Sequence, residues 1–281
     1  MPRGPILIVK TDLSSARIIA PGASREWTAP ALPDDRPPTV REAKARAAAA
    51  ASWVARDPNA KRRIDAIYTD VDESMCIWMR ATSPARPVVA AQLRAMAQEW
   101  GNDASVLAVE PLRNESAPAP GRARAAKASK PEDDAPEADA PPDQIEPAGF
   151  AVIALPDAMT RLLVNAADAA GTRIGMVATV WHLMAEVGAP TEIEGLVGTV
   201  SIDAAAGRLL WAWADASGLI AGGAARIDAE TPETTHRRVA LDWLTWAAQI
   251  GRCPARIVVI GESAKDWSGG LAPAWQEVPA T

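Results

Sequence analysis

Two aspartates in short polar turns are the residues of this chain with the clearest chemical potential. Asp12 follows an apolar run within residues 10–17, and Asp203 follows another within residues 201–207. Carboxylate oxygens are the hard ligands that Mg²⁺ prefers, so two such turns facing one another could hold a magnesium ion through water. The alternative is structural, because Asp is a favoured residue of tight turns, where it bonds to its own backbone.

Small residues beside these turns bear on whether a phosphate could bind there. Ser14 and Ser15 bring hydroxyls to the first turn, and Gly261 follows a β-branched run near the end of the sequence. Phosphates need close approach to backbone amides, which a side chain obstructs. Ser14, Ala205 and Glu262 stand where glycines would serve this purpose, and the charge of Glu262 disfavours an anion. We therefore predict no catalytic or metal-binding residue and a degenerate nucleotide pocket marked by Asp12, Ser14, Ser15, Asp203 and Gly261.

The remaining titratable residues favour structural roles. His182 lies in an apolar stretch and His236 begins a helical segment, and neither has a second ligand at metal-binding spacing. Asp70, Asp72 and Glu73 are close enough in sequence to suggest acid–base chemistry. Their position between two apolar runs instead favours a solvated turn.

The composition is that of a globular protein with room for two lobes. The 281 residues are 48% hydrophobic and 23% charged, and the net charge of −6 argues against a general electrostatic grip on nucleic acid. Cys76 and Cys253 lie in apolar runs, which favours reduced thiols over a disulfide framework. The first ten residues lack a signal-peptide core, and no apolar run is long enough to span a bilayer. These features predict a cytoplasmic protein, with docking on a membrane complex as an alternative.

Turn residues and hydrophobic periodicity divide the first part of the chain into strands and helices. Thr39 and Glu42 form the capping-box pattern of a helix start, and an alanine-rich run sustains that helix. Pro, Asp and Gly make a loop the expected structure of residues 21–38. Residues 64–71 and 75–80 are predicted to pair around a tight turn. The predicted elements are strands at 5–10, 16–20, 64–71, 75–80 and 104–109 and helices at 39–56 and 86–100.

A sharp change in composition separates this part from the rest. Residues 113–148 are almost entirely Pro, Ala, Ser and charged residues, which cannot bury enough apolar surface to offset their ordering entropy, so a disordered linker is predicted. Beyond it, Trp211, Trp213, Trp243 and Trp246 occur at strand or helix spacing. This spacing favours a core position, and a partner-facing surface is the alternative. The predicted elements are strands at 150–155, 196–202, 208–214, 218–224 and 256–261, helices at 156–170 and 235–250, and a strand running into a helix over 173–186.

Five stretches of the sequence carry a resemblance to a known family. They are KTDLSSARII, IDAIYTDVDESMCIWMRATSP, FAVIALPDAMTRLLVNAADAAG, VGTVSIDAAAGRLLWAWADASGLIAGGAARI and HRRVALDWLTWAAQIGRCPARIVVIGESA. In their order and spacing they are similar to the actin-like pilus-assembly protein PilM and to the cytoplasmic domain of its type II secretion counterpart, GspL. The resemblance spans most of the chain outside the predicted linker. The chain departs from the family's pattern at the lost glycines and at the inserted linker.

The resemblance implies an α/β protein with an actin-like (ribonuclease H-like) two-lobed fold of mixed sheets. The first lobe is expected over residues 1–112, the disordered linker over 113–148 and the second lobe over 149–281. In this superfamily two β-hairpins with Asp and Gly hold the phosphates of the nucleotide. The resemblance therefore implies that Asp12 and Asp203 face one another across a cleft.

The function that the resemblance implies is that of a cytoplasmic scaffold, peripheral at the inner membrane, in a type IV pilus or type II secretion assembly. Its expected partner is an inner-membrane pilus or secretion protein, with no nucleic acid, no membrane span of its own and a homodimer as a further option. The lost glycines favour a protein without enzymatic activity or bound cofactor. The alternative is a working kinase or ATPase of the same superfamily that uses ATP and Mg²⁺. A third interpretation is a purely architectural protein whose linker recruits its partners.

Overall fold

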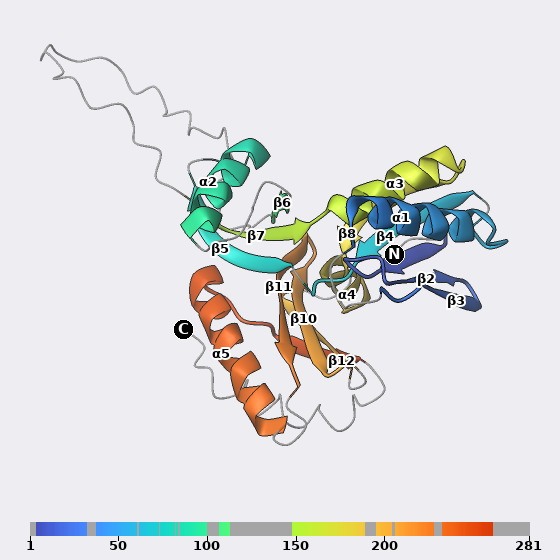
Figure 1. The fold of residues 1–281 in the computed structure, drawn as a ribbon. Coiled ribbons are helices and arrows are strands. Elements are labelled where there is room, and N and C mark those ends of the chain that lie inside the picture. The colour runs from blue at the N-terminus through green and yellow to red at the C-terminus, as the bar shows by residue number, and fades with distance from the viewer. Residues whose placement is uncertain are drawn as a thin grey trace, which may run out of the picture.

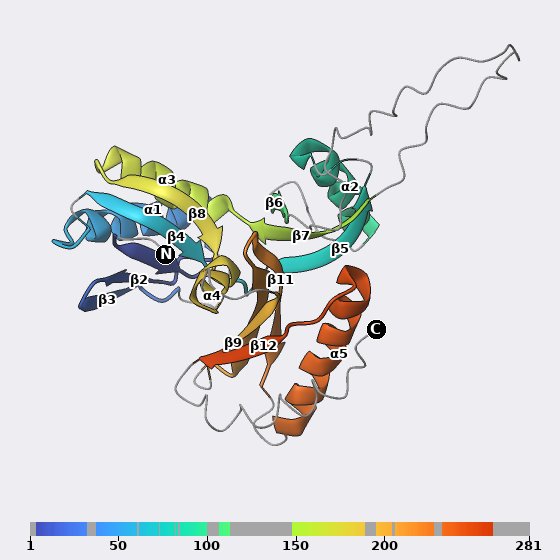
Figure 2. The same cartoon turned by 180° about the vertical axis from the view of Figure 1, so that it is seen from behind.

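Three mixed or antiparallel sheets make up this α/β protein, and helix α4 (Val180–Gly188) packs between the first sheet and the second (Figures 1 and 2). No described helix is long and apolar enough to cross a lipid bilayer. The computed structural model describes residues 4–32, 38–60, 62–72, 74–81, 83, 85–99, 107–112, 148–188, 195–203, 206–227 and 232–260.

The first sheet has the strand order β3-β2-β1-β4-β8. Strands β1, β4 and β8 are parallel, and β2 and β3 continue from β1 as antiparallel hairpins. Helices α1 and α3 pack together on one face of this sheet (Figure 1). The bounds are β1 Ile6–Val9, β2 Ser15–Ala20, β3 Ala23–Thr28, β4 Arg63–Thr69, β8 Arg173–Thr179, α1 Val40–Ala55 and α3 Ala158–Ala169.

Helix α1 forms as its sequence pattern predicts. The Thr39 hydroxyl accepts a hydrogen bond from the Glu42 N–H, and the Glu42 carboxylate accepts one from the Thr39 N–H at 2.8 Å, which completes the capping box. Its buried face includes Ala47, Ala50 and Ala51, whose small side chains permit close packing of α1 against the sheet and α3.

Strand β3 corrects the prediction of a loop over residues 21–38. Ala20 pairs with Ala23, so only two residues form the turn between β2 and β3, and Gly22 there has a φ of 75°. β3 is an edge strand with mostly exposed side chains, so it lacks the alternating apolar pattern by which a strand is recognised. Residues 33–37 lie outside the described part of the chain.

The second sheet has the order β11-β10-β9-β12 and lies between α5 and α4. Its antiparallel meander, the following helix and the late strand confirm the predicted elements, and β12 runs parallel to β9. The bounds are β9 Val197–Asp203, β10 Arg208–Asp215, β11 Gly218–Arg226, α5 Pro232–Ile250 and β12 Arg256–Ile260.

The third sheet is antiparallel, has the order β5-β7-β6 and carries α2 on one face. The prediction that residues 64–71 pair with residues 75–80 is therefore wrong, because β4 pairs with β1 and β8 whereas β5 pairs with β7. Proximity in sequence suggested a hairpin, but the true partner of β5 lies beyond the predicted linker. The bounds are β5 Met75–Ala81, α2 Arg86–Glu99, β6 Leu107–Pro111 and β7 Ala148–Pro156.

The sheets do not follow the predicted division at the linker. β7 joins the third sheet and β8 completes the first sheet, although both fall within the predicted second lobe, 149–281. Parallel pairing of β4 with β8 leaves no local sequence signal, because their connection contains the whole third sheet. The predicted linker, 113–148, lies outside the described residues except for its last residue, which opens β7.

A tryptophan cluster joins the third sheet to the second. Trp211 and Trp213 on β10 pack against Trp243 of α5, with ring centroids 6.2 and 6.0 Å away. Trp78 of β5 meets Trp246 of α5 edge-to-face at 6.4 Å. The predicted core position of the tryptophans is confirmed. The cluster also packs β5, from the first half of the chain, against α5 in the second half.

Two consecutive glycines in β11 make room for indole rings on both faces of the second sheet. A Cβ at Gly222 would lie 2.6 Å from the ring of Trp181, and one at Gly223 would lie 2.4 Å from the ring of Trp211. The Trp181 ring is buried, and its Nε1–H donates a hydrogen bond to the Gly223 carbonyl at 3.1 Å, so it cannot move aside freely.

Gly222→Ala is expected to lower the free energy of unfolding by about 1–3 kcal/mol, because the added methyl group overpacks the Trp181 site. Gly198→Ala is the matched control, since the nearest atom to its Cβ would be 3.5 Å away. Urea denaturation of both variants measures the difference, and equal stability would contradict the packing argument.

Candidate functional site

The two predicted aspartates are both turn residues in the structure. The Asp12 carboxylate accepts a hydrogen bond from the Ser14 N–H at 2.8 Å, and the Asp203 carboxylate accepts one from the Ala206 N–H at 3.0 Å. Each carboxylate thus bonds to its own turn, as the structural interpretation requires. Ser15 opens β2, where its carbonyl accepts a hydrogen bond from the backbone N–H of Lys10 at 3.1 Å.

The first turn is closed by an apolar side chain. Leu13 adopts a φ of 54°, in the left-handed region that glycine favours, and its side chain is fully buried in the core of the first sheet. The predicted pocket residue Gly261 lies outside the described residues, as do Ala205 and Glu262, which stand where glycines would serve a phosphate.

A cluster of five charged residues connects the ends of strands from the first and second sheets. Lys10 follows β1, Asp70 and Asp72 follow β4, and Asp203 and Arg208 flank the turn between β9 and β10. Ligands of α/β folds commonly bind at the carboxyl ends of parallel strands, and β1 and β4 end here. We call this group of five residues the interlobe cluster.

The interlobe cluster is centred on Asp70, which is 3% exposed. Lys10 Nζ lies 2.7 Å from one Asp70 oxygen, and Arg208 Nη1 lies 2.7 Å from the other. The same two cations bind Asp72 at 3.1 and 2.5 Å. Arg208 also lies 3.7 Å from the Asp203 carboxylate. Side chains from both lobes thus share one pair of carboxylates.

Burial and ion pairing act in opposite directions on the pKa of Asp70. Burial alone would raise the pKa, but hydrogen bonds and charge attraction from Arg208 and Lys10 outweigh it and hold the pKa below its ordinary value. The pKa of Lys10 is raised, because its bonds to Asp70 and Asp72 outweigh burial. Asp70, Lys10 and Arg208, whose pKa is also raised by its bonds to Asp70 and Asp72, are therefore charged near neutral pH.

This cluster overturns the prediction of a solvated turn at residues 70–73. Asp70 is buried and bonded to a cation 138 positions away in the sequence. The local sequence around Asp70 holds no signal for that contact, because Arg208 reaches it only through the association of the lobes. Glu73 lies outside the described residues.

Other predicted candidates have structural contacts. His182 accepts a hydrogen bond at Nδ1 from the backbone N–H of Thr179, at 3.3 Å, near the start of α4. Both cysteines are free, and burial raises the pKa of Cys76 to about 12. Among the described residues, no three His, Cys, Asp or Glu side chains gather closely enough to hold a metal ion.

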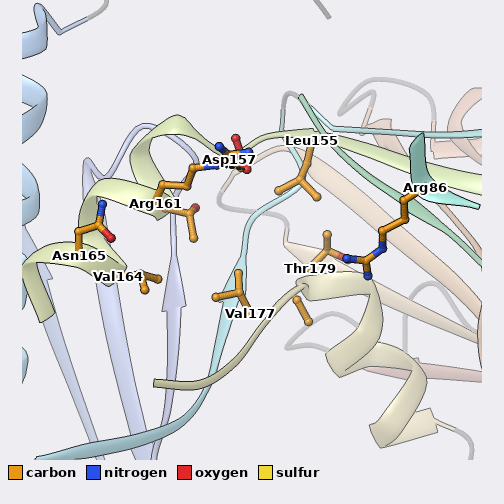
Figure 3. A pocket seen from close by; sticks show the side chains of 10 residues that line it. Arg86, Leu155, Asp157, Arg161, Val164, Asn165, Val177 and Thr179 are labelled. Carbon is orange, nitrogen blue, oxygen red and sulfur yellow. Dashed lines mark hydrogen bonds and ion pairs between the residues drawn. The ribbon is translucent and has the colours of Figure 1, made fainter. Parts of the chain in front are cut away.

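An open cavity of about 420 Å³ lies beside α3 and β8 (Figure 3), and none of the predicted pocket residues is among those that line it. Leu155 from β7, Val164 from α3 and Val177 from β8 supply apolar walls. Arg86, the first residue of α2, also lines the cavity (Figure 3). None of these residues was a sequence candidate, because the cavity forms only when α2 meets the consecutive elements β7, α3 and β8 in the fold.

The cavity also contains an unsatisfied polar group and adjoins an open strand edge. Thr160 is 4% exposed, and its hydroxyl has no hydrogen-bond partner among the described residues. No described strand pairs with the outer edge of β8. Met176 and Val177 on that strand are 42% and 46% exposed. This combination can accept an apolar ligand with polar groups at fixed positions.

No model of a known family matches the chain, and no curated protein is similar to it. A chain from a structure of the PilM–PilN type IV pilus biogenesis complex is similar in structure, with a TM-score of 0.53, 12% identity, and coverage of 98% of this chain and 87% of that chain. The protein shares the fold of that chain from the PilM–PilN complex.

Two further solved structures are similar over most of the chain. The cytoplasmic domain of EpsL, an inner-membrane component of the type II secretion system of Vibrio cholerae, has a TM-score of 0.45 and 10% identity, and the match covers 92% of this chain and 83% of that chain. A Bacteroides thetaiotaomicron protein with an actin-like ATPase fold has a TM-score of 0.39 and 8% identity, and the match covers 98% of this chain and 89% of that chain.

Arg208→Met is expected to lower the free energy of unfolding by about 1–3 kcal/mol, because it leaves the buried Asp70 with Lys10 alone. Arg17→Met is the control, since Arg17 pairs with Glu26 on the exposed surface of β2 and β3 and its loss should cost under about 1 kcal/mol. Urea denaturation of both variants at neutral pH provides the measurement. Similar losses for the two variants would show that the interlobe cluster contributes no more than a surface pair.

Proposed function

We propose that this protein is a scaffold of a type IV pilus or type II secretion assembly that docks an extended segment of an inner-membrane partner in the cavity beside α3 and β8. The observation that carries the proposal is the unpaired edge of β8 next to that cavity. The proposal places the protein at the cytoplasmic face of the inner membrane.

The geometry of the cavity favours an extended peptide over a compact metabolite. A peptide strand can add to the free edge of a sheet through backbone hydrogen bonds, while neighbouring pockets take alternate side chains. β8 offers the edge, exposed Met176 and Val177 offer apolar contact, and the cavity offers a pocket. Thr160 and Arg86 can then bond to polar groups of the bound segment.

The fold supports the class of partner. The protein resembles in fold a chain from a complex of PilM with PilN in type IV pilus biogenesis. A protein of this fold that docks a membrane-anchored partner needs a peptide-accepting surface, and the cavity beside β8 is an open apolar site among the described residues.

The nucleotide site is proposed to be degenerate, so that the protein is not an enzyme. Leu13 fills the core beneath the first turn, and Lys10 and Arg208 are already bound to Asp70 and Asp72 between the two turns. A triphosphate would have to displace these carboxylates from their cations. The alternative function, a working ATP-dependent kinase or ATPase, requires that displacement.

A fluorescent ATP analogue with Mg²⁺ is expected to show no saturable binding to the purified protein. The reason is that Lys10 and Arg208 are already paired with Asp70 and Asp72. Titration followed by fluorescence anisotropy measures this, with an unrelated actin-like ATPase as a positive control. Saturable binding that Asp12→Ala abolishes would replace the proposal of a degenerate site with that of an active nucleotide-binding protein.

Val177→Glu is expected to weaken docking of the partner segment at least tenfold, because it places a charge on the apolar margin of the cavity. The probe is a labelled peptide with the sequence of the cytoplasmic segment of a bitopic inner-membrane pilus or secretion protein from the same genome. Fluorescence anisotropy gives the affinity of each variant for this peptide.

Val40→Glu is the matched control for that experiment. Val40 is 73% exposed at the start of α1, where an acidic residue is compatible with the helix dipole. This variant should bind the peptide like the wild type. Equal affinity of Val177→Glu and wild type would exclude the β8 cavity as the docking site, and absence of binding to the wild type would exclude this class of partner.

A further inference from the structure

The first and second sheets are built on the same plan. Among the described elements, the second sheet has no counterpart of α3 and β8, which extend the first sheet beyond β4. In the first lobe, β1, β2 and β3 form a meander, α1 follows, and β4 returns parallel to β1. In the second lobe, β9, β10 and β11 form the meander, α5 follows, and β12 returns parallel to β9. The two arrangements therefore correspond strand by strand.

The difference between the lobes lies at the outer edge of the fourth strand. β8 pairs with the outer edge of β4, and α3 packs along α1. No described strand pairs with the outer edge of β12, which ends the order β11-β10-β9-β12 (Figure 2). The outward-facing backbone groups of β12 therefore have no strand partner among the described residues.

The sequence of β12 suits a strand that is covered. Residues 257–260 read Ile-Val-Val-Ile, a continuous β-branched run typical of strands buried on both faces, yet all four are only partly buried. Ile257 and Val259 pack toward the tryptophan core, so Val258 and Ile260 point to the opposite face.

Free sheet edges in soluble proteins usually carry features that prevent pairing, such as charges or proline. Strand β3, at the edge of the first sheet opposite β8, has such features, with Ser24, Arg25 and Glu26 exposed. Residues 257–260 of β12 contain neither a charge nor a proline. The edge of β12 is therefore open to pairing in a way that the edge of β3 is not.

We propose that β12 pairs antiparallel with β12 of a second copy of this chain, about a two-fold axis at Val258. Such a strand pair needs a partner run that is apolar, β-branched and uncharged, and β12 itself is one. With Val258 opposite its symmetry mate, Arg256 of each copy falls opposite Ile260 of the other, so the two arginines stay at opposite ends of the pair.

The resulting interface joins two four-stranded sheets into one of eight strands, a size that open sheets commonly reach. The strand is short, so the contact forms a weak, concentration-dependent dimer. It lies on the second lobe, whereas the proposed docking cavity lies at α3 and β8, so neither proposal depends on the other.

Sedimentation velocity over a range of protein concentrations tests the proposal. The wild type is expected to shift from monomer to dimer as concentration rises, and Val258→Lys is expected to lose the dimer because it places a charge at the centre of the strand pair. Ser24→Lys, on the edge of β3, is the control and should dimerise like the wild type. A monomer at every concentration, or a dimer that persists in Val258→Lys, would overturn the proposal.

Cross-linking provides a second test that does not depend on the stability of Val258→Lys. Residues directly opposite in an antiparallel pair have Cα atoms about 4.5–5.5 Å apart, which a disulfide can span. Val258→Cys is expected to form a disulfide-linked dimer under mild oxidation, and wild type and Ser24→Cys are not. Absence of that species in a folded Val258→Cys protein would contradict the β12 pairing.

Discussion

The buried carboxylate of Asp70 is the constraint on which the arrangement of the two lobes depends. A charge that is 3% exposed is costly unless cations and hydrogen bonds replace its lost water. Lys10 supplies one cation from the end of β1, and Arg208 supplies the other from the start of β10. Because Arg208 belongs to the second lobe, moving the lobes apart would expose or unpair the Asp70 charge. The ion pairs therefore hold the first and second sheets in one relative position.

Apolar contacts reinforce this relation at some distance from the charges. Both faces of the third sheet are packed. Met79 and Phe150 pack with α2, whereas Trp78 packs with the tryptophans of β10 and α5. Helix α4 supplies Trp181 to the same core, and the glycines of β11 admit its ring. Side chains thus bridge the first and second sheets, and an open cavity lies beside α3 and β8. This arrangement is the basis of our proposal that the protein docks a partner segment rather than a nucleotide.

Much of the fold follows from local patterns in the sequence. The capping box at Thr39 predicts α1, the β-branched run predicts β12, and tryptophan spacing predicts the core of the second sheet. Prediction failed where the partner was distant or the pattern was atypical. β3 is an exposed edge strand without alternating apolar residues, and β5 pairs with a strand beyond the predicted linker. The cavity at β8 was not predictable, because its walls come from four separate elements.

The sequence alone determined most of the helices and strands, the two aspartate turns and the closing of the first turn by a residue other than glycine, because each depends on neighbours within a few positions. Only the tertiary structure decided which strands pair, and with them the place of β8 in the first sheet. The tertiary structure also decided the ion pairing of Asp70, since Asp70 gains its second cation from Arg208, 138 positions away. A contact of that kind depends on the association of two lobes, and no local pattern records it.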